Sequence, residues 1–110
     1  MENTTVNHVE LKGRVGQDPK IFNAGDSRVA RFSVATSETY HDRKGEIREE
    51  TTWHNVCLWE GRNVTNFSEI RKGVLVNLDG RLRNVKYTSA DGIDRHFSEV
   101  VANKLEIVKI

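Results

Sequence analysis

Apolar and polar residues alternate along most of this chain with the two-residue period of a half-buried β-strand. In His8–Val15, apolar or small residues at every second position face one side and charged or polar residues face the other. The same period runs through Arg28–Thr39 and Thr51–Trp59. Between these segments, Asn23–Ser27 predicts a turn and the charged stretch His41–Gly45 predicts an exposed loop. The first half of the chain therefore predicts three strands.

The period changes after the third of these strands. Val64, Phe67 and Ile70 follow helical spacing and Gly73 supplies a helix stop, so one short helix is expected. Two-residue alternation then returns around the hairpin signal Asp91-Gly92. The segments concerned are Val74–Leu78, Arg81–Thr88 and Phe97–Val101, before a last apolar segment, Leu105–Val108. We interpret this part of the chain as two further strands, one on each side of the Asp91-Gly92 turn.

Three strands, one helix and two more strands is the element order of an OB-fold. This fold is a five-stranded Greek-key β-barrel whose sheet face and loops bind oligonucleotides or oligosaccharides. Glycines within the strands suit a small barrel, because its strands bend sharply. Other small barrels share this element order, so the order favours the OB-fold without requiring it. At 110 residues, the chain is expected to form one domain, residues 1–110, that is all-β with one short helix.

Composition narrows the class of protein. Hydrophobic residues make up 36% and charged residues 30%, a soluble globular balance, and no stretch approaches the roughly 20 apolar residues of a membrane span. Met1–Thr5 lacks the basic and then apolar segments of a signal peptide. Cys57 is the only cysteine, and the histidines lack metal-ligand spacing, so neither a metal nor another cofactor is expected. Nucleophile, phosphate-loop and paired-carboxylate motifs are lacking too, and we do not expect an enzyme.

Aromatic residues in polar, charge-rich surroundings are the strongest functional signal. Parity places Trp53 and Trp59 on one face of their strand and Val56 with Leu58 on the other. A lone strand tryptophan usually packs in a core, but this pair lies opposite the apolar face and is interpreted as exposed. Exposed rings near cations suit stacking against unpaired bases. The candidate stacking residues are Tyr40, Trp53, Trp59 and Tyr87, of which the two tyrosines fit a solvated strand edge or loop equally well.

The formal net charge is only +1, so attraction for a nucleic acid has to come from a local patch. Arg81 and Arg83 share strand parity with Tyr87, and Lys86 flanks that tyrosine. Any single arginine is more often a solvated surface charge than a phosphate ligand. The candidate phosphate contacts are Arg31, Arg62, Lys72, Arg81, Arg83, Lys86 and Arg95.

Six short strings occur in a characteristic order and spacing. They are Asn7-His8-Val9, Gly13-Arg14-Val15-Gly16-Gln17-Asp18-Pro19, Phe32-Ser33-Val34-Ala35-Thr36-Ser37-Glu38, Thr52-Trp53-His54, Arg71-Lys72-Gly73 and Gly80-Arg81-Leu82-Arg83. Together they closely resemble the bacterial single-stranded DNA-binding protein family with its mitochondrial relatives. The resemblance covers the chain from about Asn7 to the C-terminus.

This resemblance implies a homotetramer of OB-folds that wraps single-stranded DNA with little sequence preference during replication, recombination and repair. It implies a cytoplasmic, nucleoid-associated protein, or one of the mitochondrial matrix if the chain is organellar. The family's stacking aromatics correspond to Tyr40, Trp53, Trp59 and Tyr87, and His54 resembles the family histidine at the subunit interface. Tyr40 and Tyr87 stand where tryptophan is common, and Trp59 replaces a usual phenylalanine.

The chain also departs from the family pattern. Val85 lies where a second arginine of its strand is frequent, and Glu60 lies where glycine followed by lysine is favoured. The sequence ends at Val108-Lys109-Ile110, without the flexible tail and acidic tip of bacterial members. Recruitment of repair enzymes through such a tail is therefore not expected from this chain.

Two other functions fit an OB-fold of this kind. One is a dimeric primosome-type accessory protein, whose partners are proteins as much as DNA. The other is an OB-fold module that binds proteins or oligosaccharides. Aromatic residues at all four family positions favour single-stranded DNA binding over the primosome-type accessory protein, and quenching of tryptophan fluorescence by oligo(dT) but not by duplex DNA would separate it from the other module.

Overall fold

The computed structural model describes residues 4–109, so the expectations for Met1, Glu2, Asn3 and Ile110 lie outside it. Its elements, in chain order, are β1 (Val9–Val15), β2 (Lys20–Ala24), β3 (Ser27–His41), β4 (Ile47–Trp59), the 3-10 turn η1 (Phe67–Glu69), β5 (Leu75–Thr88) and β6 (Asp94–Ile107). None of the helical segments described is long and apolar enough to cross a membrane.

Five of the strands close into a barrel. Neighbours follow the order β1-β5-β6-β4-β3, and β3 pairs back with β1 through Arg14 with Ala35 and Val15 with Val34. The β4–β6 pairing is parallel, and the other barrel pairings are antiparallel. β2 lies outside the barrel as the edge partner of β3. The expected all-β, five-stranded OB-type barrel is therefore confirmed.

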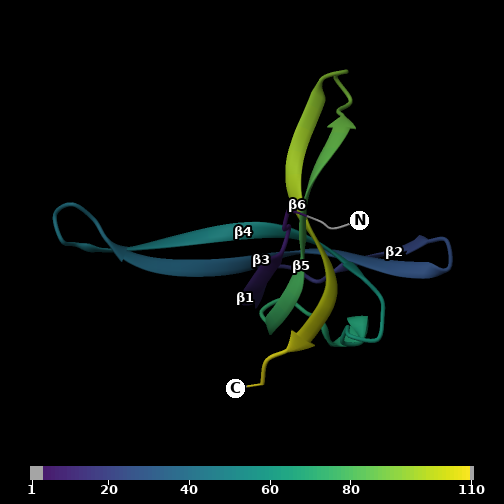
Figure 1. Ribbon diagram of the computed structural model, residues 1–110, viewed down its shortest axis with the longest axis horizontal. Coiled ribbons are helices and arrows are strands. Elements are labelled where there is room, and N and C mark those ends of the chain that lie inside the picture. Colours follow the sequence, from purple (N-terminus) through teal and green to yellow (C-terminus); the bar gives the residue numbers. More distant parts are fainter. Residues whose placement is uncertain (1–3, 110) are drawn as a thin grey trace.

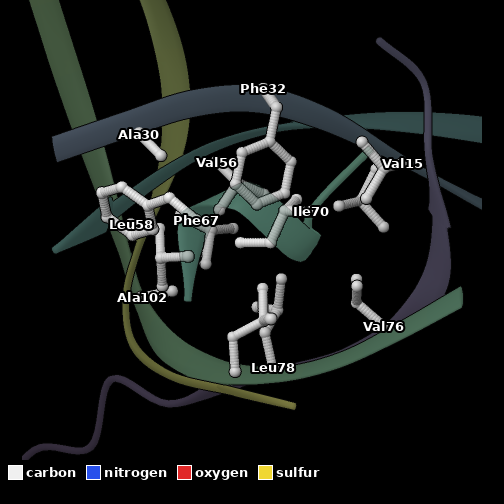
Figure 2. Close-up of a cluster of buried hydrophobic side chains, with 13 residues drawn as sticks. Val15, Ala30, Phe32, Val56, Leu58, Phe67, Ile70, Val76, Leu78 and Ala102 are labelled. Carbon is white, nitrogen blue, oxygen red and sulfur yellow. The ribbon is translucent and has the colours of Figure 1, made fainter. Parts of the chain in front are cut away.

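The barrel interior is filled by the apolar residues whose alternation predicted the strands. Figure 2 shows Phe32, Val56, Leu58 and Leu78 converging with side chains from the segment around η1. Every member of this cluster is at most 6% exposed. Because the strand period is two, the same strands turn their remaining residues outward.

The expected helix is a single 3-10 turn. Phe67 and Ile70 are both buried, and a three-residue repeat places them on one side of a 3-10 turn as well as of an α-helix. The Asn66 side chain caps the turn by accepting a hydrogen bond from the Ser68 backbone N–H. Val64 does not join it and forms an isolated bridge with Leu105. The sequence located the segment correctly and overstated its helical length.

Two hairpin arms, β3–β4 and β5–β6, project from the barrel in different directions (Figure 1). Their strands are longer than the sequence predicted, and their tips carry Gly45 and Gly92 at φ 80° and 81°. β2 is not among the predicted strands, and its last two residues, Asn23 and Ala24, fall within the turn predicted for Asn23–Ser27. It forms a tight hairpin with β3 around Gly25, which has φ 66°.

Candidate nucleic-acid interface

The outward residues of five adjacent strands form one continuous surface, which we call the outer face. Paired residues of neighbouring strands lie on the same side of a sheet, whether the strands are antiparallel or parallel, so the strand pairings define the members of the outer face. From β2 to β5 they are Lys20 and Phe22; Val29, Arg31 and Ser33; Trp59, Cys57, Asn55 and Trp53; Val101, Glu99, Phe97 and Arg95; and Arg81, Arg83, Val85 and Tyr87. Aromatic and basic side chains dominate this surface.

Trp53 is the most exposed aromatic residue of the outer face, at 61%. Its six-membered ring lies against Gly16, where even a Cβ atom would overlap the indole. The Gly16 N–H donates a hydrogen bond to the Ser33 carbonyl at 2.8 Å, which ties this glycine to β3 beneath the ring. The indole is therefore supported on one side and open to solvent on the other.

Tyr87 lies on the β5–β6 arm and is supported by a second ring. Its centroid is 5.8 Å from that of Phe97, with the planes inclined at 64°, an edge-to-face contact. Phe97 is half-buried, while Tyr87 remains 46% exposed. Phe97 thus holds the tyrosine while leaving part of its ring open.

Trp59 shares its end of the outer face with Phe22, which is not among the predicted stacking residues. Trp59 is 39% exposed and Phe22 is 50% exposed. Both line an open pocket of about 420 Å³ together with Val29, Cys57 and Arg31. Cys57 is buried although it has outer-face parity, because these side chains surround it.

Tyr40 does not lie on the outer face with the other three predicted rings. It pairs with Arg48 near the tip of the β3–β4 arm, whereas Trp53 pairs with Ala35. The register runs between these points without a bulge, so Tyr40 has the opposite parity and projects from the other side of the arm. It is exposed there, about 17 Å along the ribbon from the Trp53 level.

Four of the seven predicted phosphate-binding cations already have acidic partners, and three of these four, Arg31, Arg83 and Arg95, lie on the outer face. Arg83 Nη2 lies 2.5 Å from Glu99 Oε1, and Arg31 Nε lies 3.9 Å from Glu99 Oε2. Lys86 pairs with Asp94 at 3.2 Å, and Arg95 Nη2 lies 3.4 Å from Asp91. Within residues 4–109, no ion pair involves the remaining candidates, which are Arg62, Lys72 and Arg81.

Glu99 is the central acidic group of this surface. It is only 3% exposed, the one charged residue among those described that is buried. The two arginines around it remain about half exposed. One buried carboxylate therefore forms a hydrogen bond with the Arg83 guanidinium group and an ion pair with that of Arg31, and both guanidinium groups lie at the surface.

Glu60, an acidic residue where the family resemblance implied a basic stretch, is also paired. Arg28 Nε lies 2.6 Å from its Oε2. The guanidinium of Arg28 also lies 5.3 Å from the centroid of the Phe67 ring, within cation–π range. Arg28 offsets the negative charge of Glu60 next to Trp59.

Asp-centred turns close the two arms. The Ser89 hydroxyl and the Ile93 N–H donate to Asp91 and lower the pKa of its carboxyl group below the usual value of 3.8. The Glu46 N–H, with help from Arg48, lowers the pKa of Asp42 in the other arm. Both carboxylates thus remain ionised at neutral pH and accept the hydrogen bonds that order the turns at the tips of the arms.

His54 lies away from the outer face. Its parity is that of the core, but it is half-buried just beyond the interior, and its Nε2 lies 2.8 Å from the Thr36 hydroxyl. Within the part of the chain that the structure describes, no cluster of three or more His, Cys, Asp or Glu residues is arranged to hold a metal ion.

Phe22 and Phe97 are the outer-face rings that sequence reasoning missed. Phe97 could have been found from parity, since it alternates with Glu99 and Val101 in a strand that the hairpin signal pairs with Tyr87. Phe22 depends on recognising the short hairpin around Gly25, which sets its register against Val29.

Comparisons with known proteins agree with this architecture. The family model described as "Single-strand binding protein family" matches residues 6–108. Two curated relatives, the single-stranded DNA-binding proteins of Neisseria meningitidis serogroups A and B, are each 39% identical over 105 residues, 94% of this chain. The chain spans 60% of their length. A solved structure described as Plasmodium falciparum SSB in complex with ssDNA superposes with a TM-score of 0.80 at 30% identity, covering 99% of this chain and 100% of that one.

Proposed function

This chain belongs to the single-strand binding protein family, and from that membership we propose that it binds single-stranded DNA without sequence preference. The observation that carries the proposal is the position of Trp53, Trp59 and Tyr87 on one exposed sheet face, opposite the filled core. The fourth candidate stacking residue, Tyr40, lies on the opposite side of the β3–β4 arm and would stack on a strand that passes around that arm. The activity is binding, and no reaction is assigned to the protein.

Stacking supplies the part of the affinity that does not depend on sequence. Each base stacked on an aromatic side chain contributes about 1–3 kcal/mol, and every base has a π-face. Rings held on rigid strands lose little freedom on binding, and Gly16 and Phe97 hold two of them in place. Duplex DNA hides its base faces within the stack, so the same rings discriminate against it.

Phosphates supply the salt-dependent part. Arg62, Lys72 and Arg81 are available as they stand, while Arg31, Arg83, Lys86 and Arg95 would share or exchange their carboxylate partners. Each phosphate neutralised contributes a slope of about −0.7 to the log–log dependence of affinity on salt. Because so many cations are already paired, we expect a shallow salt dependence and a large residual affinity at high salt.

The proposal includes assembly and biological role. His54 and its partner Thr36 lie outside the binding face and are assigned to a subunit contact in a homotetramer. The protein would protect single strands during replication, recombination and repair, in the cytoplasm at the nucleoid or, for an organellar chain, in the mitochondrial matrix. These roles rest on family membership and on the resemblance of His54.

Tryptophan fluorescence tests the binding proposal, since both tryptophans of the chain lie on the outer face. We expect oligo(dT) to quench the emission strongly and a blunt duplex of equal length to leave it nearly unchanged. An oligonucleotide of abasic sites, which keeps the phosphates, should bind weakly and lose most affinity at high salt. Equal binding of the abasic and normal strands would contradict stacking, and no binding of oligo(dT) would reject the proposed function in favour of a protein-interaction module.

A further inference from the structure

The edge strand β2 adds an aromatic residue to the outer face beyond the barrel. All five of its residues are exposed, and it pairs with β3. Phe22 lies directly opposite Val29 on β3, and Val29 lies directly opposite Trp59 on β4. The two rings therefore flank the same valine from the two neighbouring strands.

The space between these two rings is open and has an apolar floor. Val29 and Cys57 are 5% and 2% exposed and lie below it, while the pocket of about 420 Å³ is lined by both rings. Within residues 4–109, the only ring pair in contact is Tyr87 with Phe97. Phe22 and Trp59 thus do not fill this space by stacking on each other.

The spacing of the strands leaves room for a planar base between the two rings. Residues two strands apart are separated by about 9–10 Å at their Cα atoms. Stacked bases are about 3.4 Å apart, so a base between two rings requires roughly 7 Å between the ring planes. Side chains of phenylalanine and tryptophan can close the remaining distance by small rotations.

The rim of the pocket carries the charge that a nucleotide needs. Arg31 and Arg83 both line it, and they share the single carboxylate of Glu99, which leaves a net positive charge. The nearby Glu60 is paired with Arg28. A phosphate joined to a base in the pocket would therefore meet guanidinium groups.

We propose that Phe22 and Trp59 form a slot that sandwiches one nucleobase of the bound single strand, with Arg31 and Arg83 contacting the adjoining phosphate. This rests on the proposed single-strand binding and makes Phe22 a fifth base-stacking residue. The slot grips both faces of its base, whereas Trp53 and Tyr87 each offer one supported ring.

Substitutions at Phe22 test the slot, with Ile21→Ala as the matched control. Ile21 is the preceding residue of β2, is similarly exposed at 44%, and faces the other side of the sheet. We expect Phe22→Ala to weaken oligo(dT) binding at high salt at least about fivefold. Phe22→Leu, which keeps an apolar side chain without a π-face, should also weaken it, and Phe22→Trp should retain affinity. Ile21→Ala should bind like the unmodified protein.

Trp59 supplies an internal readout in a Trp53→Phe background, where it is the sole tryptophan. Oligo(dT) should quench its emission, and Phe22→Leu should reduce that quenching at saturation. If oligo(dT) quenches Trp59 equally in both proteins, and Phe22→Leu binds as tightly as Ile21→Ala, the slot is refuted while single-strand binding stands. If the unmodified protein fails to bind oligo(dT), the proposed function itself fails. Circular dichroism of each variant checks that the sheet is intact.

Discussion

The inner and outer faces of β3 and β4 belong to the same two strands, but the inner face is buried in the core and the outer face exposes its tryptophans to solvent. Phe32, Val34, Val56 and Leu58 are at most 4% exposed, while the alternating Trp53 and Trp59 keep 61% and 39% of their surface in solvent. The inner residues are aliphatic or phenylalanine and fill a closed space, whereas the outer rings lie over glycine or beside a pocket. Apolar character therefore serves stability on one face and recognition on the other.

The largest effect should come from the inner face. Leu58→Ala removes a side chain that is 0% exposed and leaves a cavity, so we expect a loss of about 2–5 kcal/mol in the free energy of unfolding. Urea denaturation measures the loss. Under conditions where the variant remains folded, its affinity for oligo(dT) should be unchanged. A specific loss of affinity in a folded Leu58→Ala protein would break the separation between the two faces.

A second, smaller effect concerns the one buried charge of the outer face. Glu99→Gln removes the carboxylate that Arg31 and Arg83 share, which leaves both guanidinium groups freer to meet phosphates. We expect tighter binding at low salt and a log–log salt slope steeper by about 0.7 for each additional phosphate neutralised. Salt titrations of oligo(dT) affinity give the slope.

Glu60→Gln is the control for Glu99→Gln because it makes the same change in net charge next to Trp59, at an exposed ion pair. It should alter the slope less than Glu99→Gln does. Weaker binding by Glu99→Gln at low salt would mean that Glu99 positions the arginines for DNA rather than competing for them.

The smallest effect should appear at the tip of the β5–β6 arm. The hydrogen bonds from Ser89 and Ile93 lower the pKa of Asp91, so its contribution to turn stability is present above about pH 3.8 and is lost as pH falls through the lowered pKa. Asp91→Asn should abolish this pH dependence with little effect on global unfolding, because the Asp91 side chain is exposed in a turn at the tip of the arm. An NMR titration of the Ile93 amide tests this, and an unchanged profile in the variant would contradict it.

Strand parity explains how much of the molecule could be predicted. Parity separated Trp53 and Trp59 from Val56 and Leu58, because successive side chains of a strand point to opposite faces and only one face of a half-buried strand is apolar. It did not indicate that Cys57 is buried, since Val29 and Phe22 come from other strands. The alternation of residues within one strand does not show which side chains of neighbouring strands will bury a given residue.

Long-range contacts set the remaining limits. Arg31 and Glu99 lie far apart in the chain, and only the finished sheet shows that Arg83 shares the same carboxylate. The parity of Tyr40 relative to Trp53 requires the register of the β3–β4 hairpin, which alternation within one strand does not provide. β2 escaped prediction because both of its faces are exposed, so it lacks the apolar–polar contrast that reveals a strand.

The closure of the barrel through β1 has a consequence for the order of folding. β1 pairs with β3 through only two residue pairs, and its main partner, β5, lies more than half the chain away. Pairing between strands so far apart in the chain is slow, because closing the long loop between them costs conformational entropy before any stabilising contact forms. The hairpins β2–β3 and β3–β4 are local, so we expect the segment that carries Phe22, Trp53 and Trp59 to form before β1 closes the barrel.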